Sequence, residues 1–157
     1  DVSIHDNLGF PSDRIVSGVT GGVRFVGVCI PWRATHVSGG RNDRQIWEDH
    51  LLYLDALKEL LSEVMSQDPL IVTGDFNQWI PKARQPKYAY EKLKEVLSLG
   101  LELHTAGPLG PDGDQLIDHL VTTPDQQVKN LEVLAKKTVE GMNLSDHYGI
   151  CAEIQTI

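Results

Sequence analysis

A long amphipathic segment that runs into a short apolar one limits the possible folds of this chain most. Between residues 43 and 66 the apolar side chains recur at steps of three and four residues: Trp47, Leu51, Leu54, Leu57, Leu61 and Val64. This spacing predicts a long helix that buries one face. Asn42 with Gln45 resembles a capping box at its start, and Asp68-Pro69 is expected to end it. Residues 70–73 then predict a short strand that is buried on both faces.

The remaining segments predict strands and one more helix around that unit. Residues 14–20 and 23–30 are rich in β-forming side chains, and Gly21-Gly22 between them predicts a hairpin turn. Residues 87–99 predict a second helix, with Gly100 at the left-handed position that ends many helices. Further strands are predicted at residues 101–105, 116–122, 128–136 and 148–154. Strands with two intervening helices are typical of an α/β or α+β layered domain.

Length, composition and charge exclude several classes of protein. The chain has 157 residues, 41% of them hydrophobic and 23% charged, which suits one globular domain rather than a disordered tail, a collagen or a coiled-coil rod. No apolar run approaches the roughly 20 residues of a membrane span, so no membrane segment is expected. Because the net charge is −8, binding of nucleic acid through bulk charge is excluded.

The first residue and the cysteines lead to two further expectations. Because the chain starts with Asp1 rather than Met, it is expected to be processed or to be a piece of a longer protein. Cys29 and Cys151 are too few and too far apart for a disulfide framework or a zinc site. Both lie in apolar, strand-like runs, so both are expected to be buried. This use of cysteine fits a reducing, cytoplasmic setting.

Three short stretches place acidic and histidine side chains in or beside predicted strands: Gly74-Asp75-Phe76-Asn77, Ile117-Asp118-His119 and Ser145-Asp146-His147. A carboxylate that leaves a buried strand is poorly solvated and needs a cation or a hydrogen-bond donor. A hard divalent cation suits carboxylates and an amide oxygen, and a neighbouring histidine can contact a phosphoryl oxygen or water. Each stretch alone is typical of a turn, a cap or a surface pair. Together and in this order they indicate a site.

Taken in order, the three stretches resemble the signature of the endonuclease/exonuclease/phosphatase family, which includes deoxyribonuclease I and the abasic-site endonucleases. The motifs span residues 70–151, and the preceding helix with Arg44, Gln45 and Trp47 also resembles one in that family. The resemblance implies an α+β fold, a four-layer α/β/β/α sandwich of two mixed β-sheets with outer helices, here lacking the N-terminal strands. Residues 1–157 would then be the C-terminal portion of a single domain, with the site at one end of the sandwich.

The resemblance also implies a role for each residue. Asp75 would act on the attacking water as base or orienting group, and Asn77 would hold the phosphate, the metal or the attacking group. Asp118 would pair with His147, and His147 would bind a phosphate oxygen or act as the acid. Asp146 would help to hold Mg²⁺, with Mn²⁺ as an alternative. The reaction would be phosphoester hydrolysis by in-line attack of water, with the cation neutralising the developing charge.

The chain departs from the family in two ways. A glutamate on an early strand is a principal metal ligand in the family, and a full domain has roughly 250 residues. The chain is therefore expected to be a fragment, or its missing strands come from elsewhere. At the end of the strand predicted at residues 23–30, where family members often contact phosphate through a histidine or tyrosine, Arg33 and His36 are the alternatives here.

Two classes of function remain open at this point. The first is a metal-dependent nuclease, phosphodiesterase or phosphatase. The second is a non-catalytic or degenerate fragment of the same fold that acts as a binding module. The substrate would be a phosphoester, with nucleic acid as one class, because basic and aromatic side chains alternate after the first motif and can hold a phosphate backbone and stack a base. A solvated loop is the alternative for these residues: Trp79, Lys82, Arg84, Lys87, Tyr88 and Tyr90.

Two further histidines are kept out of the predicted site. His50 lies within the long helix and is expected to be a packing or surface residue. His119 follows Asp118 in a predicted strand, where successive side chains point to opposite faces. His119 is therefore expected to point away from the site.

Overall fold

The computed structural model describes residues 2–4 and 14–157, and these form a sandwich built on a six-stranded mixed sheet. The parallel pair at its centre is β3 (Val23–Cys29) and β4 (Leu70–Asp75). All other neighbours in this sheet are antiparallel. The order is β1-β2-β3-β4-β6-β5, with β1 (Val2–Ile4), β2 (Ile15–Thr20), β5 (Glu102–Leu103) and β6 (Asp118–Thr122).

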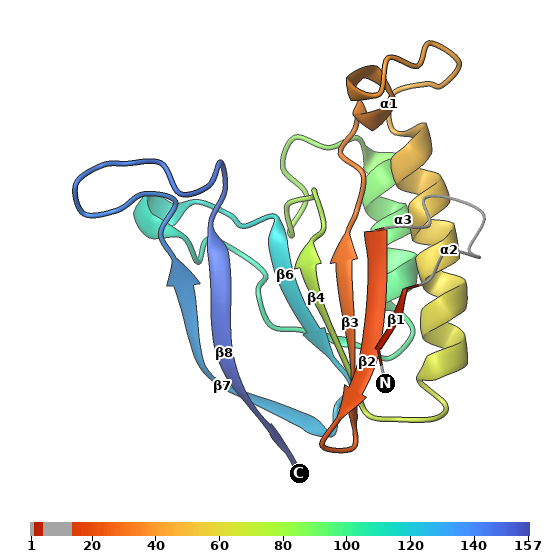
Figure 1. Cartoon of the computed structure of the whole chain (residues 1–157), viewed down its shortest axis with the longest axis vertical. Coiled ribbons are helices and arrows are strands. Elements are labelled where there is room, and N and C mark those ends of the chain that lie inside the picture. Colours follow the sequence, from red (N-terminus) through yellow and green to blue (C-terminus); the bar gives the residue numbers. More distant parts are fainter. Residues whose placement is uncertain (1, 5–13) are drawn as a thin grey trace.

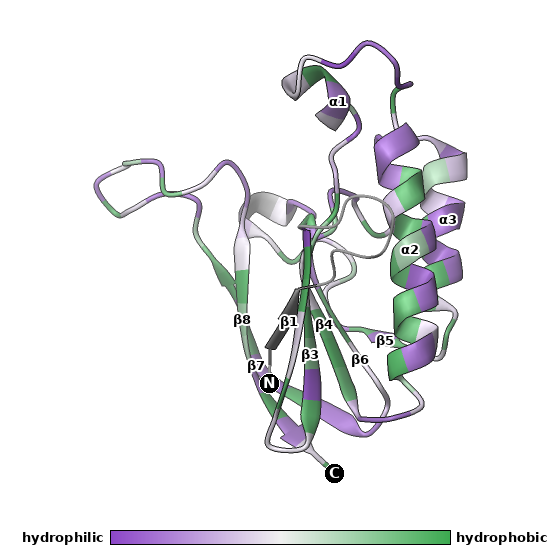
Figure 2. Ribbon diagram, turned by 45° about the vertical axis from the view of Figure 1, so that its right-hand side comes forward, coloured by the Kyte–Doolittle hydropathy of each residue, from purple (hydrophilic) through white to green (hydrophobic). Residues whose placement is uncertain are grey.

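Two helices cover one face of this sheet (Figure 1). Helix α2 (Glu48–Val64) connects the parallel strands β3 and β4, and α3 (Lys87–Leu97) follows β4. The central strands are largely hydrophobic (Figure 2), because each packs apolar side chains against the helices. Tyr53, Leu54 and Leu57 of α2 are fully buried there. A short helix, α1 (Thr35–Ser38), lies between β3 and α2.

The other face of the six-stranded sheet carries a second sheet of two antiparallel strands, β7 (Gln126–Leu134) and β8 (Gly149–Thr156). Ile71 and Leu120 of the large sheet pack against Val128, Ile150 and Ile154 of the small one. Within the described residues the layers are therefore helix, sheet and sheet. This confirms the predicted α+β sandwich in truncated form.

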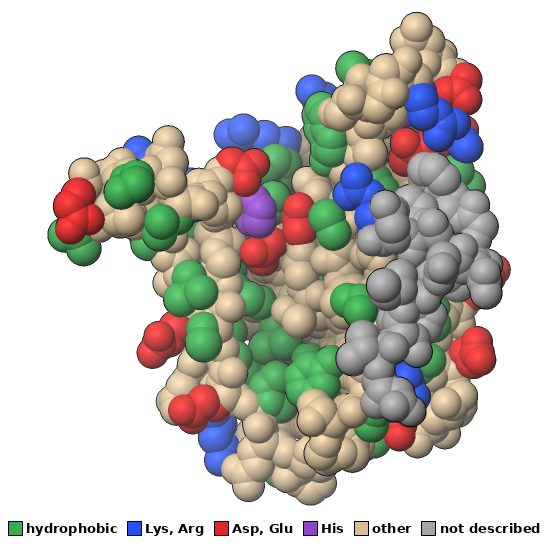
Figure 3. All heavy atoms as spheres, in the orientation of Figure 1, with side chains coloured by type: hydrophobic (Ala, Val, Ile, Leu, Met, Phe, Trp, Pro, Cys, Tyr) green, Lys and Arg blue, Asp and Glu red, His purple; other side chains and the backbone are tan. Residues whose placement is uncertain are grey.

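Part of the large sheet is open on the side of the second sheet. Val16 and Phe25 of β2 and β3 are 42% and 39% exposed. They lie in an apolar hollow beside the small sheet, below a group of acidic and histidine side chains (Figure 3). Among the described residues, no helix is both long and apolar enough to cross a bilayer.

The predicted elements are present, but the start of the long helix is wrong. Helix α2 begins at Glu48 rather than at residue 43, and the predicted capping box does not form. Trp47 adopts a left-handed conformation with φ of 75°, and its backbone N–H donates to the carbonyl of Arg33 at 2.7 Å. The carboxylate of Glu48 accepts a hydrogen bond from the backbone N–H of Gln45 at 2.8 Å. The polar side chain that holds this turn thus lies three residues later than predicted.

The expected burial of both cysteines is also wrong, because Cys29 and Cys151 are exposed. In β8 the neighbours Ile150 and Ala152 pack on the large sheet, so Cys151 points to the opposite side. In β3 Val28 faces the core and Cys29 alternates with it. No observation on the described residues tests the cytoplasmic setting, which stays a prediction.

Candidate active site

The first predicted motif lies where β4 ends, and its glycine is required by the close approach of β3. Gly74 has φ of +138°, which favours glycine. A Cβ at this position would lie 2.0 Å from the carbonyl oxygen of Val28. Asp75 follows as the last residue of β4 and lies opposite Asp118 of β6 in the antiparallel register. Two carboxylates are thus set side by side by strand pairing.

Asn77 holds Asp75 in place. Its backbone N–H donates to Oδ1 of Asp75 at 2.8 Å, and its side-chain Nδ2 donates to Oδ2 at 2.7 Å. Nδ2 also donates to the carbonyl of Ile30 at 2.9 Å. Burial raises the pKa of Asp75 above its usual value, and the backbone N–H of Asn77 opposes that shift. The N–H groups of Asn77 thus orient Asp75, and only its amide oxygen remains for a ligand.

The second and third motifs meet at His147. Its Nδ1 lies 3.4 Å from Oδ1 of Asp118, and its Nε2 lies 3.6 Å from Oδ1 of Asp146. The distance between Nδ1 of His147 and Oδ1 of Asp118 is that of an ion pair and is longer than that of a good hydrogen bond. Both atoms are buried, and neither makes a hydrogen bond. Burial raises the pKa of Asp118, while the charge of His147 lowers it. The side chain of Asp146 is 96% exposed.

The structure therefore brings the five predicted side chains to one end of the sandwich. The charges of His147, Asp118 and Asp146 all act on the pKa of Asp75, after the effect of its burial. The carboxylates come from the ends of β4 and β6 and from the segment before β8. Their mutual repulsion leaves the cluster in need of positive charge.

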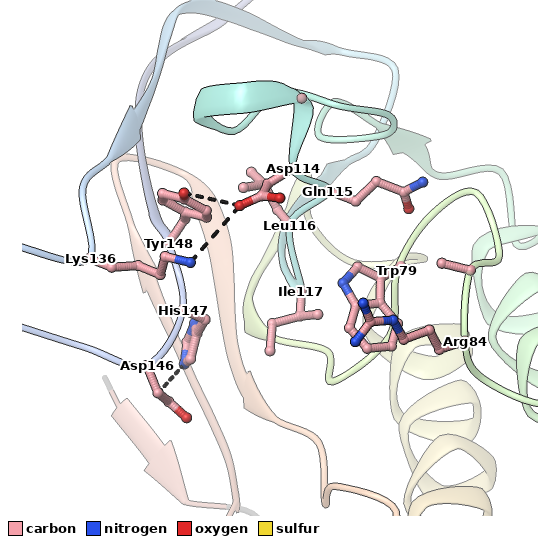
Figure 4. A pocket seen from close by; sticks show the side chains of 12 residues that line it. Trp79, Arg84, Asp114, Gln115, Leu116, Ile117, Lys136, Asp146, His147 and Tyr148 are labelled. Carbon is pink, nitrogen blue, oxygen red and sulfur yellow. Dashed lines mark hydrogen bonds and ion pairs between the residues drawn. The ribbon is translucent and has the colours of Figure 1, made fainter.

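A cavity of about 500 Å³ opens beside His147 and Asp146 (Figure 4). Trp79 and Arg84 line one wall, with the guanidinium carbon of Arg84 5.7 Å from the Trp79 ring centroid. Lys136 and Tyr148 line another part, together with Asp114. The motifs alone did not assign Asp114, Lys136 or Tyr148 to the site. Tyr148 follows the third motif directly, which was the one available signal.

A second cavity of about 420 Å³ lies on the other side of Trp79 and Arg84. Trp32, Arg33, Trp47 and Asn77 also line it, so the predicted substrate residues Arg33 and Trp79 are neighbours of the candidate site. His36, the other residue predicted to contact phosphate, lines neither cavity. It lies in α1 and is only 6% exposed. The structure brings Arg33, and not His36, to the cavities.

The two histidines kept out of the site are buried, and both support the loop that carries Asn77. Nδ1 of His50 donates to the carbonyl of Pro31 at 2.7 Å, and its Nε2 accepts from the side-chain amide of Gln78 at 2.7 Å. Nε2 of His119 donates to the carbonyl of Gln78 at 2.9 Å, on the face away from Asp118. The packing role expected for His50 and the exclusion of His119 are confirmed.

His50 makes stability depend on pH. Burial lowers its pKa from 6.5 to about 4, so the unfolded chain binds a proton there more readily than the folded chain. The contribution is fully present above pH 6.5 and is lost as pH falls towards 4. Between pH 7 and pH 4.5 we expect His50 to account for a loss of roughly 2.5 kcal/mol in the free energy of unfolding. Urea unfolding of wild type and His50→Gln at both pH values measures it, and equal pH dependence in the two proteins would contradict it.

The described residues do not form a complete metal site. Within residues 2–4 and 14–157, no group of three His, Cys, Asp or Glu side chains is placed to hold a metal ion. Mg²⁺ needs near-octahedral oxygen coordination, and the side chain of Asp146 is almost fully exposed to solvent. Magnesium therefore stays a prediction from the resemblance.

Neither models of known protein families nor curated proteins match this sequence. Solved structures match its fold. The 3′ phosphatase NExo from Neisseria, bound to a product DNA hairpin, has a TM-score of 0.72 and 21% identity, over 99% of this chain and 70% of that chain. An AP endonuclease from Archaeoglobus fulgidus has a TM-score of 0.70 and 17% identity, over 99% of this chain and 71% of that one.

The 3′–5′ exonuclease NExo from Neisseria meningitidis is similar as well, with a TM-score of 0.68 and 20% identity over 98% of this chain and 70% of that chain. At these identities the likeness establishes the fold. The resemblance stated from the three motifs is thus confirmed for the fold: the chain has the architecture of part of an endonuclease/exonuclease/phosphatase domain. The assignment of residues 1–157 to the C-terminal portion of one domain stays a prediction.

Proposed function

We propose that this chain carries the catalytic end of a phosphoester hydrolase. One observation carries the proposal: Asp75, held by Asn77, and His147, beside Asp118, meet next to a cavity lined by cationic side chains. Hydrolysis of a phosphoester needs a group that takes a proton from water and groups that bind the phosphate charge. The cluster contains both kinds of group within one end of the fold.

Asp75 is the proposed base. Its pKa is raised by burial, and a base works best when its pKa approaches the working pH. Both carboxylate oxygens accept hydrogen bonds from Asn77, which fixes the direction in which a lone pair can point towards water. We assign Asn77 to positioning Asp75, with its amide oxygen directed to the attacking group.

His147 is the proposed donor to the phosphate. Asp118 lies 3.4 Å from its Nδ1 and orients the ring, which leaves Nε2 to face a phosphate oxygen or the leaving oxygen. In the present arrangement Nε2 faces Asp146 at 3.6 Å. Because the side chain of Asp146 is almost fully exposed, a bound phosphate can displace it from His147.

Nucleic acid is the proposed substrate class. The second cavity offers the indole rings of Trp32 and Trp79 together with Arg33, a combination that can stack a base and hold a phosphate. Two of the similar structures are named for 3′ phosphatase and AP endonuclease activities, and one of these is bound to a DNA hairpin. Since the net charge is −8, contacts must be local and affinity must be sensitive to salt.

A substrate panel tests the proposal. The full natural chain that contains these residues is incubated with a 3′-phosphorylated DNA hairpin, a duplex with an abasic site, single-stranded RNA and an inositol phosphate. Release of phosphate or shortened strands from a nucleic acid is the expected result. Saturable binding of a nucleic acid without hydrolysis of any substrate would contradict it and favour the non-catalytic binding module.

Asp118→Asn is expected to reduce kcat by about 10²-fold or more, with a much smaller change in KM. The variant keeps the shape of the side chain but removes the negative charge that lies 3.4 Å from Nδ1 of His147. That charge matters most when negative charge develops on the phosphate. Steady-state kinetics on the best substrate of the panel measures the effect, with Asp125→Asn as a matched control outside the cluster. An unchanged kcat would mean that the Asp118–His147 contact is only structural.

Mg²⁺, or Mn²⁺ in its place, is the proposed cation, with Asp146 as one ligand. The described residues supply too few ligands for a tight site. We therefore expect residues 1–157 to bind Mg²⁺ only weakly and to hydrolyse phosphodiesters near the background rate. Isothermal titration calorimetry with MgCl₂ and MnCl₂ measures the affinity, and Asp146→Asn is the comparison. Micromolar binding that Asp146→Asn abolishes would show that this chain completes the site.

A further inference from the structure

Lys136 is held on the cavity wall by two contacts that leave its charge available. Its Nζ lies 4.1 Å from the centroid of the Tyr148 ring, a cation–π contact. It lies 4.0 Å from Oδ2 of Asp114, the limit of an ion pair. The hydroxyl of Tyr148 donates to the same oxygen at 3.1 Å. Asp114 thus fixes the ring under Lys136 more firmly than it neutralises the ammonium group.

A second cation faces the same cavity from the opposite wall. Arg84 lies over the Trp79 ring, and within the described part of the chain it makes no ion pair with an acidic side chain. Figure 4 shows Lys136 and Tyr148 on one side of the cavity and Arg84 with Trp79 on the other. His147 and Asp146 line the space beside them. Each cation therefore rests on an aromatic face, and the cavity that both cations line adjoins the proposed catalytic end.

We propose that Lys136 and Arg84 form a two-cation subsite for a second phosphate of the substrate, next to the phosphate at His147. Tyr148 and Trp79 keep the two cations in place and offer flat faces to the nucleotide between the phosphates. Lys136 and Arg84 set specificity and take no part in the chemical step. A preference for such substrates in hydrolysis rests on the proposed function, whereas tighter binding of ligands with a second phosphate does not.

This subsite makes the number of phosphates the feature that is recognised. In this arrangement, a ligand whose single phosphate binds at His147 leaves the subsite of Lys136 and Arg84 without a phosphate. A nucleic acid strand with two successive phosphates satisfies both, because a charge-assisted contact adds to each phosphate. The chain should therefore prefer a phosphodiester with a neighbouring phosphate over an isolated phosphoester.

Binding of defined dinucleotides tests the subsite. The ligands are a thymidine dinucleotide with its single internal phosphate and the same compound with an added 5′ or 3′ phosphate. Affinities are measured by calorimetry in the full natural chain carrying Asp75→Asn, which prevents hydrolysis. We expect the added phosphate, at one of the two ends, to tighten binding about tenfold. Lys136→Met and Arg84→Met should each remove most of that gain, and Lys136→Arg should keep it.

Lys129→Met is the matched control, because Lys129 lies in β7, the strand that ends two residues before Lys136, and its Nζ donates to Gln155 on the small sheet, away from the cavity. The logarithm of the affinity for a single-stranded oligonucleotide should fall linearly with the logarithm of the salt concentration. Lys136→Met should reduce the steepness of this slope by about 0.7, whereas Lys129→Met should not change it. Circular dichroism of each variant checks that it folds.

The outcomes separate the subsite from the proposed function. If the added phosphate brings no gain at either end, or if Lys136→Met weakens the one-phosphate and two-phosphate ligands equally, the subsite is wrong even where hydrolysis is found. If the gain is present and depends on Lys136 and Arg84 while the substrate panel shows no hydrolysis, the subsite stands and the proposed hydrolase function fails.

Discussion

Substitution of Asp75 by Asn is expected to lower kcat for phosphoester hydrolysis by roughly 10²- to 10⁴-fold. Asparagine keeps the size of the side chain but cannot accept a proton from the attacking water. The substrate contacts proposed for His147, Arg84 and Lys136 are unaffected, so KM should change far less than kcat. The measurement is steady-state kinetics on the best nucleic acid substrate over a range of pH. The wild-type rate should rise with pH through the raised pKa of Asp75.

Asp43→Asn is the matched control, because Asp43 is exposed and paired with Arg41, away from the candidate site. It should leave kcat and the pH profile unchanged. Urea unfolding of Asp75→Asn separates a catalytic defect from a folding defect. Removal of the buried charge favours folding, but asparagine replaces one oxygen that accepts from Asn77 by an N–H donor, so we expect a net change of only about 1 kcal/mol in the free energy of unfolding at neutral pH. A fully active Asp75→Asn enzyme would exclude Asp75 as the base.

Among the glycines whose surroundings the structure describes, Gly74 is expected to lose the most stability when it is replaced by alanine. The new Cβ would lie 2.0 Å from the carbonyl oxygen of Val28, and backbone atoms of β3 cannot move aside without breaking the β3–β4 pairing. The left-handed φ of +138° adds strain. We expect a loss of more than about 4 kcal/mol in the free energy of unfolding, or failure to fold. Urea unfolding followed by tryptophan fluorescence measures it.

Gly22→Ala is a close control for this prediction. Gly22 also has a positive φ, of +78°, but nothing lies within 4 Å of a Cβ added there. Its substitution tests the backbone strain without the clash, so it should cost only about 1 kcal/mol. If the two variants lose equal stability, the close approach of β3 to Gly74 is not what requires glycine in the first motif.

Much of this architecture follows from local patterns in the sequence. The apolar repeat of residues 43–66, the apolar run at residues 70–73 and the Gly21-Gly22 turn predicted α2, β4 and the β2–β3 hairpin, because each depends on side chains close together in the chain. The three ordered acidic and histidine motifs predicted the cluster at one end of the sandwich. The order of the motifs predicted this cluster because each motif lies at or beside the end of a strand.

Other features depend on contacts between segments far apart in the chain, and no local pattern encodes them. The Asp114–Tyr148–Lys136 contacts join a loop to the segment between β7 and β8, and Asn77 binds the carbonyl of Ile30 as well as Asp75. The exposure of Cys29 and Cys151 is set by which face of each strand meets the other sheet, so their apolar neighbours in the sequence misled the prediction of burial. Local sequence determines which elements form and where their polar ends lie, since these are short-range properties. Which side chains share a cavity is decided by the register and packing of the two sheets.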